Sequence, residues 1–355
     1  MATIAGVGRR PWYSPARIGL TLKEARRYPI IPLIIMLVVL IIPSIFANVI
    51  APHDPIKSDL SHRLEPPGWM GPTLTTLTVV ETVKDSTTEV SLANARRLKE
   101  GSALGETPHL KPDLAVGQQV QVIKKPGGGW ERPLGTDKLG RDILTRMIYG
   151  ARISLMVSLV VIAIAGVVGT TLGIMAAYFG GWTDYFISRV IDIAMSLPAI
   201  LIALVLVVVV GPGIKVLIGI IAGVLWVQYA RLVRGETLGI MSRDYIARAR
   251  VAGCSHLRIM ARHVFPNVFN SLIVLATLQI GFVIIIEASL SFLGVGIPRP
   301  TPSWGSIVAD GRDLIIQTAW WVSLFPGLAL VLTVLSVNLV GDWLRDKLDP
   351  KLRQL

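Results

Sequence analysis

Long apolar runs alternate with polar stretches over most of the chain. We predict that six of these runs are membrane-spanning helices, because about 20 apolar residues cross the hydrocarbon core at 1.5 Å of rise per residue. The expected spans are residues 29–50, 153–179, 187–210, 214–233, 269–293 and 318–341. The expected fold class is therefore an all-α polytopic membrane protein with six transmembrane helices.

The first apolar run could also be interpreted as a signal peptide. Its length, and the lack of a small-residue cleavage site before Ala51-Pro-His-Asp-Pro55, favour a span that is retained. The basic residues 1–28 that precede it are then an N-terminal cytoplasmic segment.

Residues 51–150 interrupt the membrane pattern. The β-type runs Thr75–Val83 and Val116–Lys124 precede a glycine turn, and they predict a small β-rich domain at about 65–133 within an extracytoplasmic loop. A disordered linker is the alternative. Because the charges of this insertion balance and prolines bound it, we expect an appendage that membrane assembly does not require.

Composition supports the membrane class. Hydrophobic residues make up 52% of the chain and charged residues 16%, and the mean hydropathy is +0.61, which excludes an ordinary soluble domain. Cys254 is the only cysteine, so an intrachain disulfide is excluded.

The formal net charge of +12 lies almost entirely beside predicted spans. Residues 1–28 carry six basic side chains against one acidic side chain, and residues 231–263 carry seven arginines against two acids. The tail 342–355 is also slightly basic. This distribution indicates that both termini and the 231–263 loop are cytoplasmic, and it argues against nucleic-acid binding.

Small and aromatic residues refine the helix predictions. Gly169 and Gly173 have the GxxxG spacing that lets two helices approach closely. Five tryptophans fall near predicted span ends and are expected to form an aromatic belt: Trp182, Trp226, Trp320, Trp321 and Trp343.

The segment Asp244–Asn267 is basic and amphipathic, and it lies between two apolar runs. We expect Ser242 to cap a first short helix with Asp244 in its first turn, and Gly253 to end it. Ser255 is expected to cap a second short helix that stops at Pro266. Two short helices at a sharp turn, too polar for lipid, indicate a docking element.

Here the chain resembles the inner-membrane permease subunits of ABC importers, whose loop carries the pattern EAA-x3-G-x9-I-x-LP. Ala249, Gly253 and Pro266 match the pattern, whereas Ala247 replaces its glutamate. In that family the loop, here 235–268, fits a groove of the cytoplasmic ATPase. The resemblance implies these coupling residues: Asp244, Tyr245, Ala249, Arg250, Gly253, Leu257, Met260, Arg262 and Pro266.

Further segments resemble one subfamily, the dipeptide, oligopeptide and nickel permeases of the C type. They are 51–55, 134–142, 149–155, 178–182, 229–235, 287–294, 302–305, 309–313 and 341–346. The resemblance implies a type I ABC importer permease fold, with a transmembrane core over residues 151–341 and a cytoplasmic tail over 342–355.

The resemblance also implies the function. The chain is expected to be the translocation subunit of an ATP-driven importer of di- and oligopeptides in a bacterial or archaeal inner membrane. Its expected partners are a B-type permease as heterodimer, two ATPases that bind ATP and Mg²⁺, an extracytoplasmic peptide-binding protein and the lipid bilayer. Nickel or another small solute is the alternative cargo.

The chain itself is expected to be non-catalytic and to hold no cofactor. It has no GxxxxGK[ST] phosphate loop, no HExxH and no Cys/His cluster for a metal. A secondary transporter is a rival hypothesis, but it predicts an internal repeat with broken helices, and the sequence shows no repeat. A membrane-anchored enzyme or signalling protein is a third.

Candidate site residues also occur outside the coupling loop. Glu287 lies in an apolar run, and a buried acid in a membrane is costly enough to suggest function. With Ser291 it is a candidate for the translocation pathway, or else a structural partner of another polar group. The outer-side candidates are Asp137, Arg141, Asp142 and Trp304. Of these, Arg141 and Asp142 form an outer gate, contact the binding protein, or fix the helix on the membrane surface.

Overall fold

The computed structural model describes residues 29–78, 119–125, 127–316 and 319–348. Chain contacts divide the protein into two compact units. The helical unit comprises Met1–Phe46, Ala151–Pro298 and Ala329–Leu355, and the loop unit comprises Ala47–Gly150 and Arg299–Leu328. Each unit is described separately below.

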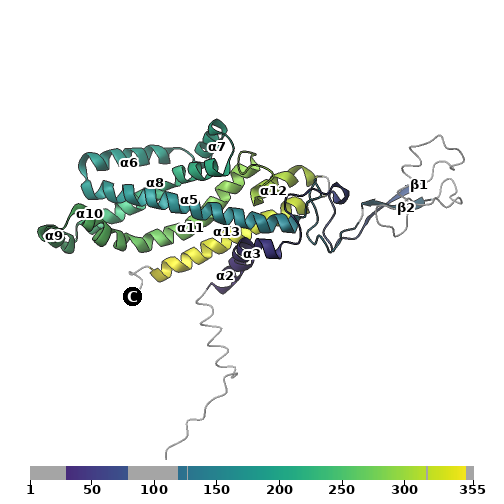
Figure 1. Ribbon diagram of the computed structural model, residues 1–355, viewed down its shortest axis with the longest axis horizontal. Coiled ribbons are helices and arrows are strands. Elements are labelled where there is room, and N and C mark those ends of the chain that lie inside the picture. Colours follow the sequence, from purple (N-terminus) through teal and green to yellow (C-terminus); the bar gives the residue numbers. More distant parts are fainter. Residues whose placement is uncertain (1–28, 79–118, 126, 317–318, 349–355) are drawn as a thin grey trace, which may run out of the picture. The chain divides into compact units, whose positions relative to one another are not determined.

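The described residues are mostly helical (Figure 1). In chain order the helices are α2 (Ile30–Met36), η1 (Leu37–Ile41), α3 (Ile42–Ile50), η2 (Leu60–His62), α5 (Ile143–Phe179), α6 (Gly181–Ser196), α7 (Ala199–Val210), α8 (Ile214–Met241), α9 (Asp244–Val251), α10 (His256–Ile259), η3 (Met260–Val264), α11 (Phe265–Phe292), α12 (Trp304–Gly311), η4 (Arg312–Leu314) and α13 (Trp321–Leu348). Of these, η1 and η3 are π-helical, and η2 and η4 are 3₁₀ turns.

Within the described residues, five helices are long and apolar enough to cross a membrane. They are Ile30–Ile50, Ile143–Phe179, Ile214–Met241, His256–Phe292 and Trp321–Leu348. The pair α6–α7 adds a sixth span if the two bent helices are counted as one. The prediction of an all-α membrane protein is confirmed.

The third expected span, 187–210, is not a single helix. It is broken between α6 and α7, where the helix axes differ by 90°. Leu197 is extended, with φ −106° and ψ 143°. Pro198 explains the break, because proline disfavours helical conformation in the preceding residue and lacks the N–H that a continuing helix needs.

The expected stop at Pro266 is wrong. The helix that contains α10, η3 and α11 runs without a break through His256–Phe292. A π-helical turn over Met260–Val264 directly precedes the proline, and the Asn267 side-chain amide donates to the His263 carbonyl at 2.6 Å. Pro266 is in the first turn of α11, and the wider π-helical turn before it lets the helix pass the missing proline N–H without a break.

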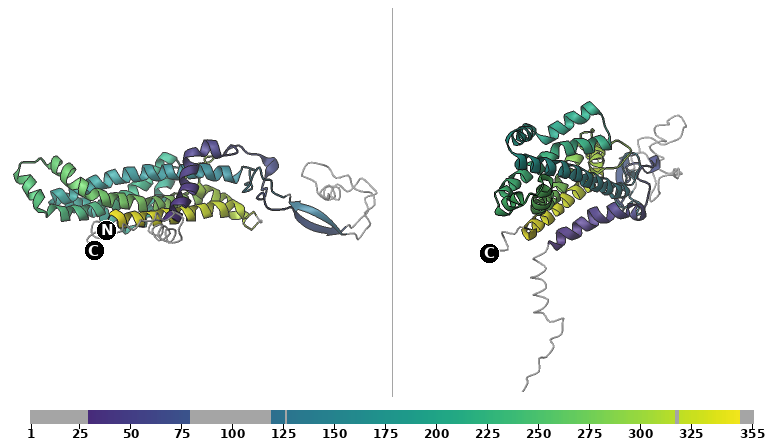
Figure 2. Two further views of the ribbon diagram at one scale, coloured as in Figure 1. Left: turned by 90° about the horizontal axis from the view of Figure 1, so that it is seen from below. Right: turned by 60° about the vertical axis from the view of Figure 1, so that its left-hand side comes forward.

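In the helical unit, α8 packs against α5, α6, α7 and α11 (Figures 1 and 2). A Cβ built on Gly169 would lie 2.3 Å from the Trp226 carbonyl oxygen, and one on Gly173 would lie 2.6 Å from the Ala230 carbonyl oxygen. The backbones of α5 and α8 therefore touch, as the GxxxG spacing predicted. The surrounding apolar core contains Val157, Val161, Ala203, Val207, Ile221, Leu225, Val283 and Leu290.

The loop unit contains the strands β1 (Thr73–Thr78) and β2 (Gln119–Lys125), which pair antiparallel with Thr75 opposite Val122. The ends of the insertion lie together, because the Gly68 N–H donates to the Pro133 carbonyl at 3.1 Å. Residues 79–118 lie outside the described residues, so the fold of the 65–133 insertion stays a prediction.

The tryptophans do not all behave as interface residues. Trp182 is 86% exposed, as expected of an aromatic belt. Trp321 is instead buried in the loop unit, where its indole N–H donates to the Thr136 carbonyl at 3.2 Å. The belt prediction is therefore wrong for Trp321.

We predict that Gly169→Ala destabilises the helical unit. Its Cβ would overlap the backbone of α8, so the two helices must separate, and overpacking of this kind costs about 1–3 kcal/mol. Gly166→Ala is the matched control, because its Cβ would meet the Tyr229 ring at an ordinary 3.7 Å. The thermal unfolding midpoint in detergent should fall for the first variant only. Equal midpoints would contradict the close contact.

Candidate functional site

The polar connection between α8 and α10 begins with α9. Asp244 lies in the first turn of α9, as predicted. The N-cap is Arg243 without a side-chain cap, and the Ser242 hydroxyl donates instead to the Gly239 carbonyl at 2.9 Å. The prediction that Ser242 caps α9 is wrong, because its hydroxyl is used at the end of α8.

Gly253 has φ +76°, and nothing lies within 4 Å of a Cβ built on it. The Cys254 N–H donates to the Ala249 carbonyl at 3.1 Å, and the Gly253 N–H donates to the Arg250 carbonyl at 3.0 Å. These two bonds form a Schellman motif, which requires a left-handed residue at this position. Ser255 then caps α10 by accepting from the Arg258 N–H at 3.4 Å, so the predicted roles of both residues are confirmed.

The loop is anchored by residues that the sequence pattern did not single out. Ile246, Ile259 and Val264 are fully buried, and they pack with Ile174 of α5 and Val233 of α8. Of the predicted coupling residues, Ala249 is buried and Met260 is half-buried. The exposed ones are Asp244, Tyr245, Arg250, Gly253, Leu257, Arg262 and Pro266. Leu257 is an apolar side chain of this exposed set, and 72% of it is exposed.

A hydrogen bond ties the loop to the end of α5. The Tyr178 hydroxyl lies 2.7 Å from His256 Nδ1, and the two rings meet edge to face at 5.6 Å. The Arg250 guanidinium lies 5.8 Å from the centre of the Tyr178 ring, within cation–π range. No sequence pattern predicts this contact, because the two residues are 78 positions apart.

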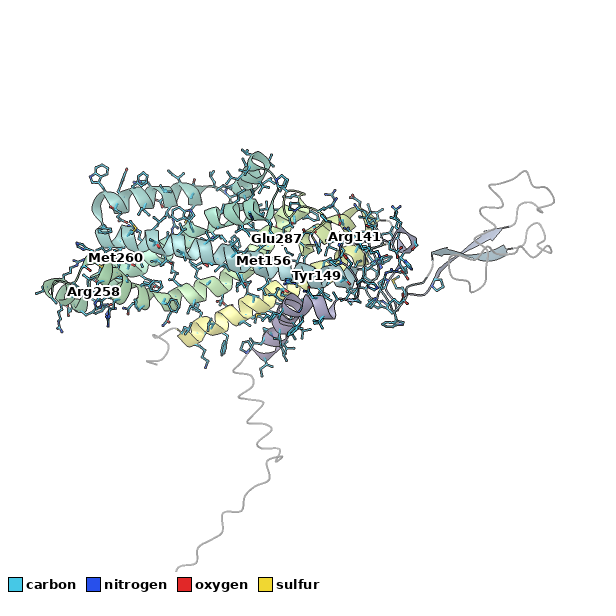
Figure 3. The ribbon with its side chains drawn as sticks, viewed as in Figure 1. Arg141, Tyr149, Met156, Arg258, Met260 and Glu287 are labelled. Atoms are coloured by element: carbon cyan, nitrogen blue, oxygen red, sulfur yellow. The ribbon has the colours of Figure 1, made fainter. Side chains whose placement is uncertain are left out.

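Glu287 is fully buried on α11 within the helical unit (Figure 3). It accepts hydrogen bonds from the Ser291 hydroxyl at 2.7 Å and from the Ser154 hydroxyl of α5 at 3.4 Å. The structure thus brings together the two pathway candidates, Glu287 and Ser291, and adds Ser154. In this single chain the carboxylate faces neighbouring helices, and its role in the pathway stays a prediction.

A second polar contact inside the helical unit joins α8 and α11. The Gln279 amide donates to the Gln228 side-chain oxygen, while the Gln279 side-chain oxygen is buried without a partner among the described residues. Such amide pairs can hold transmembrane helices together. The sequence analysis missed this pair, although two glutamines in apolar runs are a signal of the same kind as Glu287.

In the loop unit, the segment Leu134–Asp142 lies at the centre of the packing. Gly135 and Gly140 have φ +79° and +72°, and a Cβ on Gly140 would lie 1.6 Å from the Asp59 carbonyl oxygen. Asp142 accepts from the Thr145 N–H at 2.8 Å and so caps α5. Outside the spans, hydrogen bonds from Ser61 and His62 lower the pKa of Asp59 to about 2.

Asp137 and Asp310 join four basic side chains in an ion cluster. Arg146 lies 2.6 Å from the Asp137 carboxylate and 3.3 Å from that of Asp310, and Arg141 contacts the same two carboxylates at 2.8 and 3.4 Å. Arg299 also pairs with Asp310, and Lys138 lies 4.0 Å from it. Asp137, Arg141, Arg146 and Asp310 are buried, so removing one charge would leave the others uncompensated.

The four outer-side candidates are therefore interior residues. Asp137, Arg141 and Asp142 are buried, and so is Trp304, whose indole donates to the Met147 carbonyl at 2.9 Å. This burial argues against direct contact with another protein. It favours a structural role for these residues at the start of α5. Arg146 and Asp310 were missed as members of the cluster.

Metal ligands do not gather in the described part of the chain, where no group of three or more His, Cys, Asp or Glu side chains is placed to hold an ion.

Known proteins resemble this chain over part of its length. A putative peptide transport system permease protein of Brucella suis biovar 1 is 44% identical over 225 residues, which cover 63% of this chain and 75% of the relative. The dipeptide transport system permease protein of Escherichia coli K12 is 43% identical over 228 residues, or 64% of this chain and 76% of the relative.

A solved structure of the inward-facing MetNI methionine ABC transporter matches 58% of this chain and 98% of its own, with 19% identity and a TM-score of 0.49. That similarity is too low to bear on the fold. Residues 169–354 match the family described as the inner membrane component of binding-protein-dependent transport systems. This match and the permease relatives show that the chain belongs to that family and is a multi-pass inner-membrane protein.

Proposed function

We propose that this chain is the translocation subunit of an ATP-driven importer of di- and oligopeptides. The observation that carries the proposal is the 43–44% identity to permeases named for peptide and dipeptide transport, over three quarters of their length. Nickel or another small solute stays the alternative cargo.

The proposed subunit is not an enzyme. Two partner ATPases bind ATP and Mg²⁺ and hydrolyse the nucleotide, a B-type permease completes the pathway, and an extracytoplasmic protein delivers the peptide. The distribution of basic residues supports placing both termini and the 235–268 loop in the cytoplasm and residues 51–150 outside. The small β-rich insertion at about 65–133 and the count of six spans are part of the same proposal.

The coupling surface consists of exposed residues of α9, α10 and η3. Leu257 supplies an apolar projection, and Tyr245, Arg250 and Arg262 surround it with polar and basic groups. Buried Ile246 and Ile259 hold this surface against the ends of α5 and α8. A displacement of this surface by an ATPase would therefore also displace the ends of α5 and α8.

The break between α6 and α7 is a feature that a secondary transporter would also show. That rival additionally predicts a second broken helix related to the first by an internal repeat. Membership of the binding-protein-dependent family favours an ATP-driven importer instead.

The function is tested with the complex reconstituted into liposomes. With binding protein outside and ATP inside, a labelled dipeptide should accumulate, and an excess of unlabelled dipeptide should compete, whereas nickel should not. If nickel accumulated and the dipeptide did not, nickel would be the cargo instead of the peptide. ATP-independent, ion-gradient-driven uptake would overturn the proposed class.

Gly253→Val should uncouple transport. A β-branched residue at φ +76° costs about 1–3 kcal/mol in backbone strain, and no atom within 4 Å would clash, so the effect is one of conformation. The turn between α9 and α10 should shift, and ATP hydrolysis stimulated by loaded binding protein should fall.

Gly253→Asn is the matched control, because asparagine tolerates the left-handed region better than valine does. It should retain most of the stimulated hydrolysis. Both variants should still copurify with the second permease. Normal stimulation in Gly253→Val would show that this turn does not contribute to coupling.

Asp310→Asn should destabilise the loop unit. It leaves buried Arg141 and Arg146 to share Asp137, and breaking a buried ion pair typically costs about 3–5 kcal/mol. The unfolding midpoint and the protease resistance of residues 47–150 should fall. Asp313→Asn is the control, since the Asp313 side chain is 79% exposed. A normal midpoint with lost peptide uptake would indicate a gate instead.

A further inference from the structure

Helix α6 carries a polar face although it belongs to a candidate membrane span. Tyr185, Arg189, Asp192 and Ser196 follow one another at spacings of four, three and four residues, so they share one side of the helix. All four residues are exposed in this chain. Lipid beside this face would leave charged groups in hydrocarbon, which is costly, so the face requires a different neighbour.

Two arginines share the carboxylate of Asp192. Arg189 lies 3.9 Å from it on the same helix, and Arg231 of α8 lies 3.5 Å from it. The Arg189 guanidinium also lies 5.1 Å from the centre of the Tyr185 ring, within cation–π range. The three charged side chains are 55–62% exposed. Because two arginines face one aspartate, this triad has a surplus of one positive charge.

The neighbouring ion pair between α6 and α8 does not cancel that surplus. The Arg234 guanidinium donates to both carboxylate oxygens of Asp184, at 2.5 and 2.7 Å. This pair is neutral as a whole, and its side chains are only 32% and 24% exposed. A two-bond contact of this kind holds the two helices together, whereas the surplus charge of the triad lies on an exposed surface.

The position of Asp192 along α6 places its carboxylate away from the membrane surface. Trp182, at the start of α6, is 86% exposed, and tryptophan is enriched at the membrane–water interface. Asp192 is ten residues further on, roughly 15 Å along a helix that packs beside the span α8 (Figure 1). Its side chain has a single CH₂ group, so it cannot extend back to the interface as arginine can. The carboxylate therefore needs water or protein beside it.

The polar face leads to the break between α6 and α7. Ser196, Leu197 and Pro198 are exposed, and the Leu197 backbone is extended instead of helical. Irregular backbone at membrane depth is tolerated only where protein covers it or where it lines a water-filled cavity. The backbone of the break and the side chains of the polar face therefore impose the same requirement on what lies beside α6.

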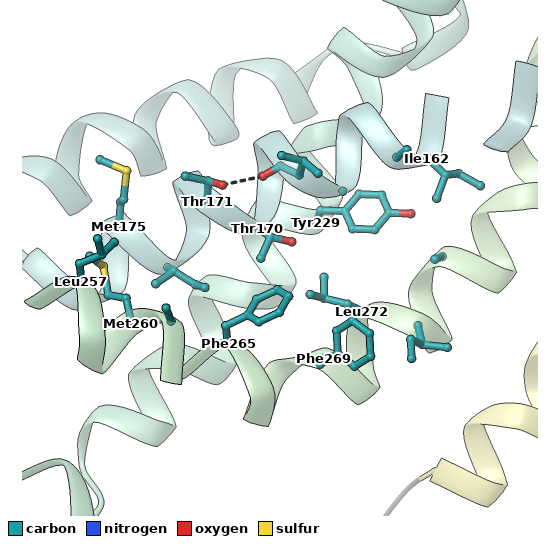
Figure 4. A pocket seen from close by; sticks show the side chains of 17 residues that line it. Ile162, Thr170, Thr171, Met175, Tyr229, Leu257, Met260, Phe265, Phe269 and Leu272 are labelled. Carbon is teal, nitrogen blue, oxygen red and sulfur yellow. Dashed lines mark hydrogen bonds between the residues drawn. The ribbon is translucent and has the colours of Figure 1, made fainter. Parts of the chain in front are cut away.

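Apolar surfaces of the helical unit lie elsewhere. Trp182, Phe186, Val190 and Ile193 are exposed and follow one another at spacings of four, four and three residues, so they form an apolar stripe next to the polar face. A groove of about 590 Å³ between α5 and the helix of α10, η3 and α11 has no charged residue in its lining (Figure 4). These surfaces suit lipid or apolar protein, whereas the polar face suits a charged solute in water.

We propose that the polar face of α6, together with Arg231, lines the water-filled translocation pathway, where its surplus positive charge attracts the carboxylate of a passing peptide. The identity of the cargo rests on the proposed function, but the exposure of the face to water does not. Every peptide with a free C-terminus presents a carboxylate, and a charge in a narrow, partly apolar passage acts on it more strongly than in bulk water.

Access of water is tested by cysteine labelling of the assembled complex in liposomes. Cys254→Ser removes the native thiol, and Ser196→Cys or Ile193→Cys then places one thiol on the polar face or on the apolar stripe. A charged methanethiosulfonate on both sides of the membrane should modify Ser196→Cys about tenfold faster or more, because it reacts with thiolates in water. Modification of this chain is followed by mass spectrometry, so cysteines of other subunits do not interfere.

The charge is tested by comparing an anionic with a cationic methanethiosulfonate at Ser196→Cys. Arg231→Gln should lower the ratio of the anionic to the cationic rate about tenfold, as expected when one unit charge acts oppositely on the two reagents across about 6 Å of water. Lys215→Gln, at the other end of α8, is the matched control and should leave the ratio unchanged. An excess of dipeptide should slow the anionic reagent, and the same dipeptide with a C-terminal amide should not.

Four results would overturn the proposal. Equal rates at Ser196→Cys and Ile193→Cys would show that water does not distinguish the polar face. Labelling of Ser196→Cys in the isolated chain that disappears in the complex would assign the face to the second permease. A rate ratio unchanged by Arg231→Gln would show that the triad does not act on solutes, and equal protection by the dipeptide and its amide would exclude the carboxylate. Labelling requires no transport, so these failures are distinguishable from a failure of peptide uptake.

Discussion

The close contact between α5 and α8 is the interaction on which the helical unit depends. In lipid, apolar helices gain little from burying apolar surface against each other, so association relies on close packing and on polar contacts. Gly169 and Gly173 let the α8 backbone reach α5, and α8 in turn packs against α6, α7 and α11. Tyr229 of α8 also lies at this contact, beside Gly169.

Buried charge is handled differently in the two units. In the loop unit, arginines and aspartates compensate one another through charge-assisted bonds around Asp137 and Asp310. In the helical unit, Glu287 is bound by the hydroxyls of Ser154 and Ser291. The bond from Ser154 joins α11 to α5 at the level of Glu287, and the role of Glu287 in the pathway stays a prediction.

Features that depend on neighbouring residues were predictable from the sequence. The length of the apolar runs predicted most of the spans. The GxxxG spacing predicted a close helix approach at Gly169 and Gly173, which the structure places between α5 and α8. The glycine of the family pattern located the turn at Gly253. Proline effects were not predictable: Pro198 breaks a span, whereas Pro266 lies in a continuous helix, where a π-helical turn precedes it. Only part of the ion cluster could be predicted from the sequence. Asp137 and Arg141 are four residues apart, whereas Asp310 lies 169 residues beyond Arg141.

The continuous helix through His256–Phe292 gives coupling a short physical route. It carries Leu257 and Arg262 near one end and Glu287 near the other, roughly 45 Å apart at 1.5 Å per residue. A displacement of the coupling surface would move the candidate pathway residue without any chain of side-chain rearrangements. The π-helical turn at Met260–Val264 and Pro266 lie between the two sites, so any bend of the helix at that turn would reduce the displacement that reaches Glu287.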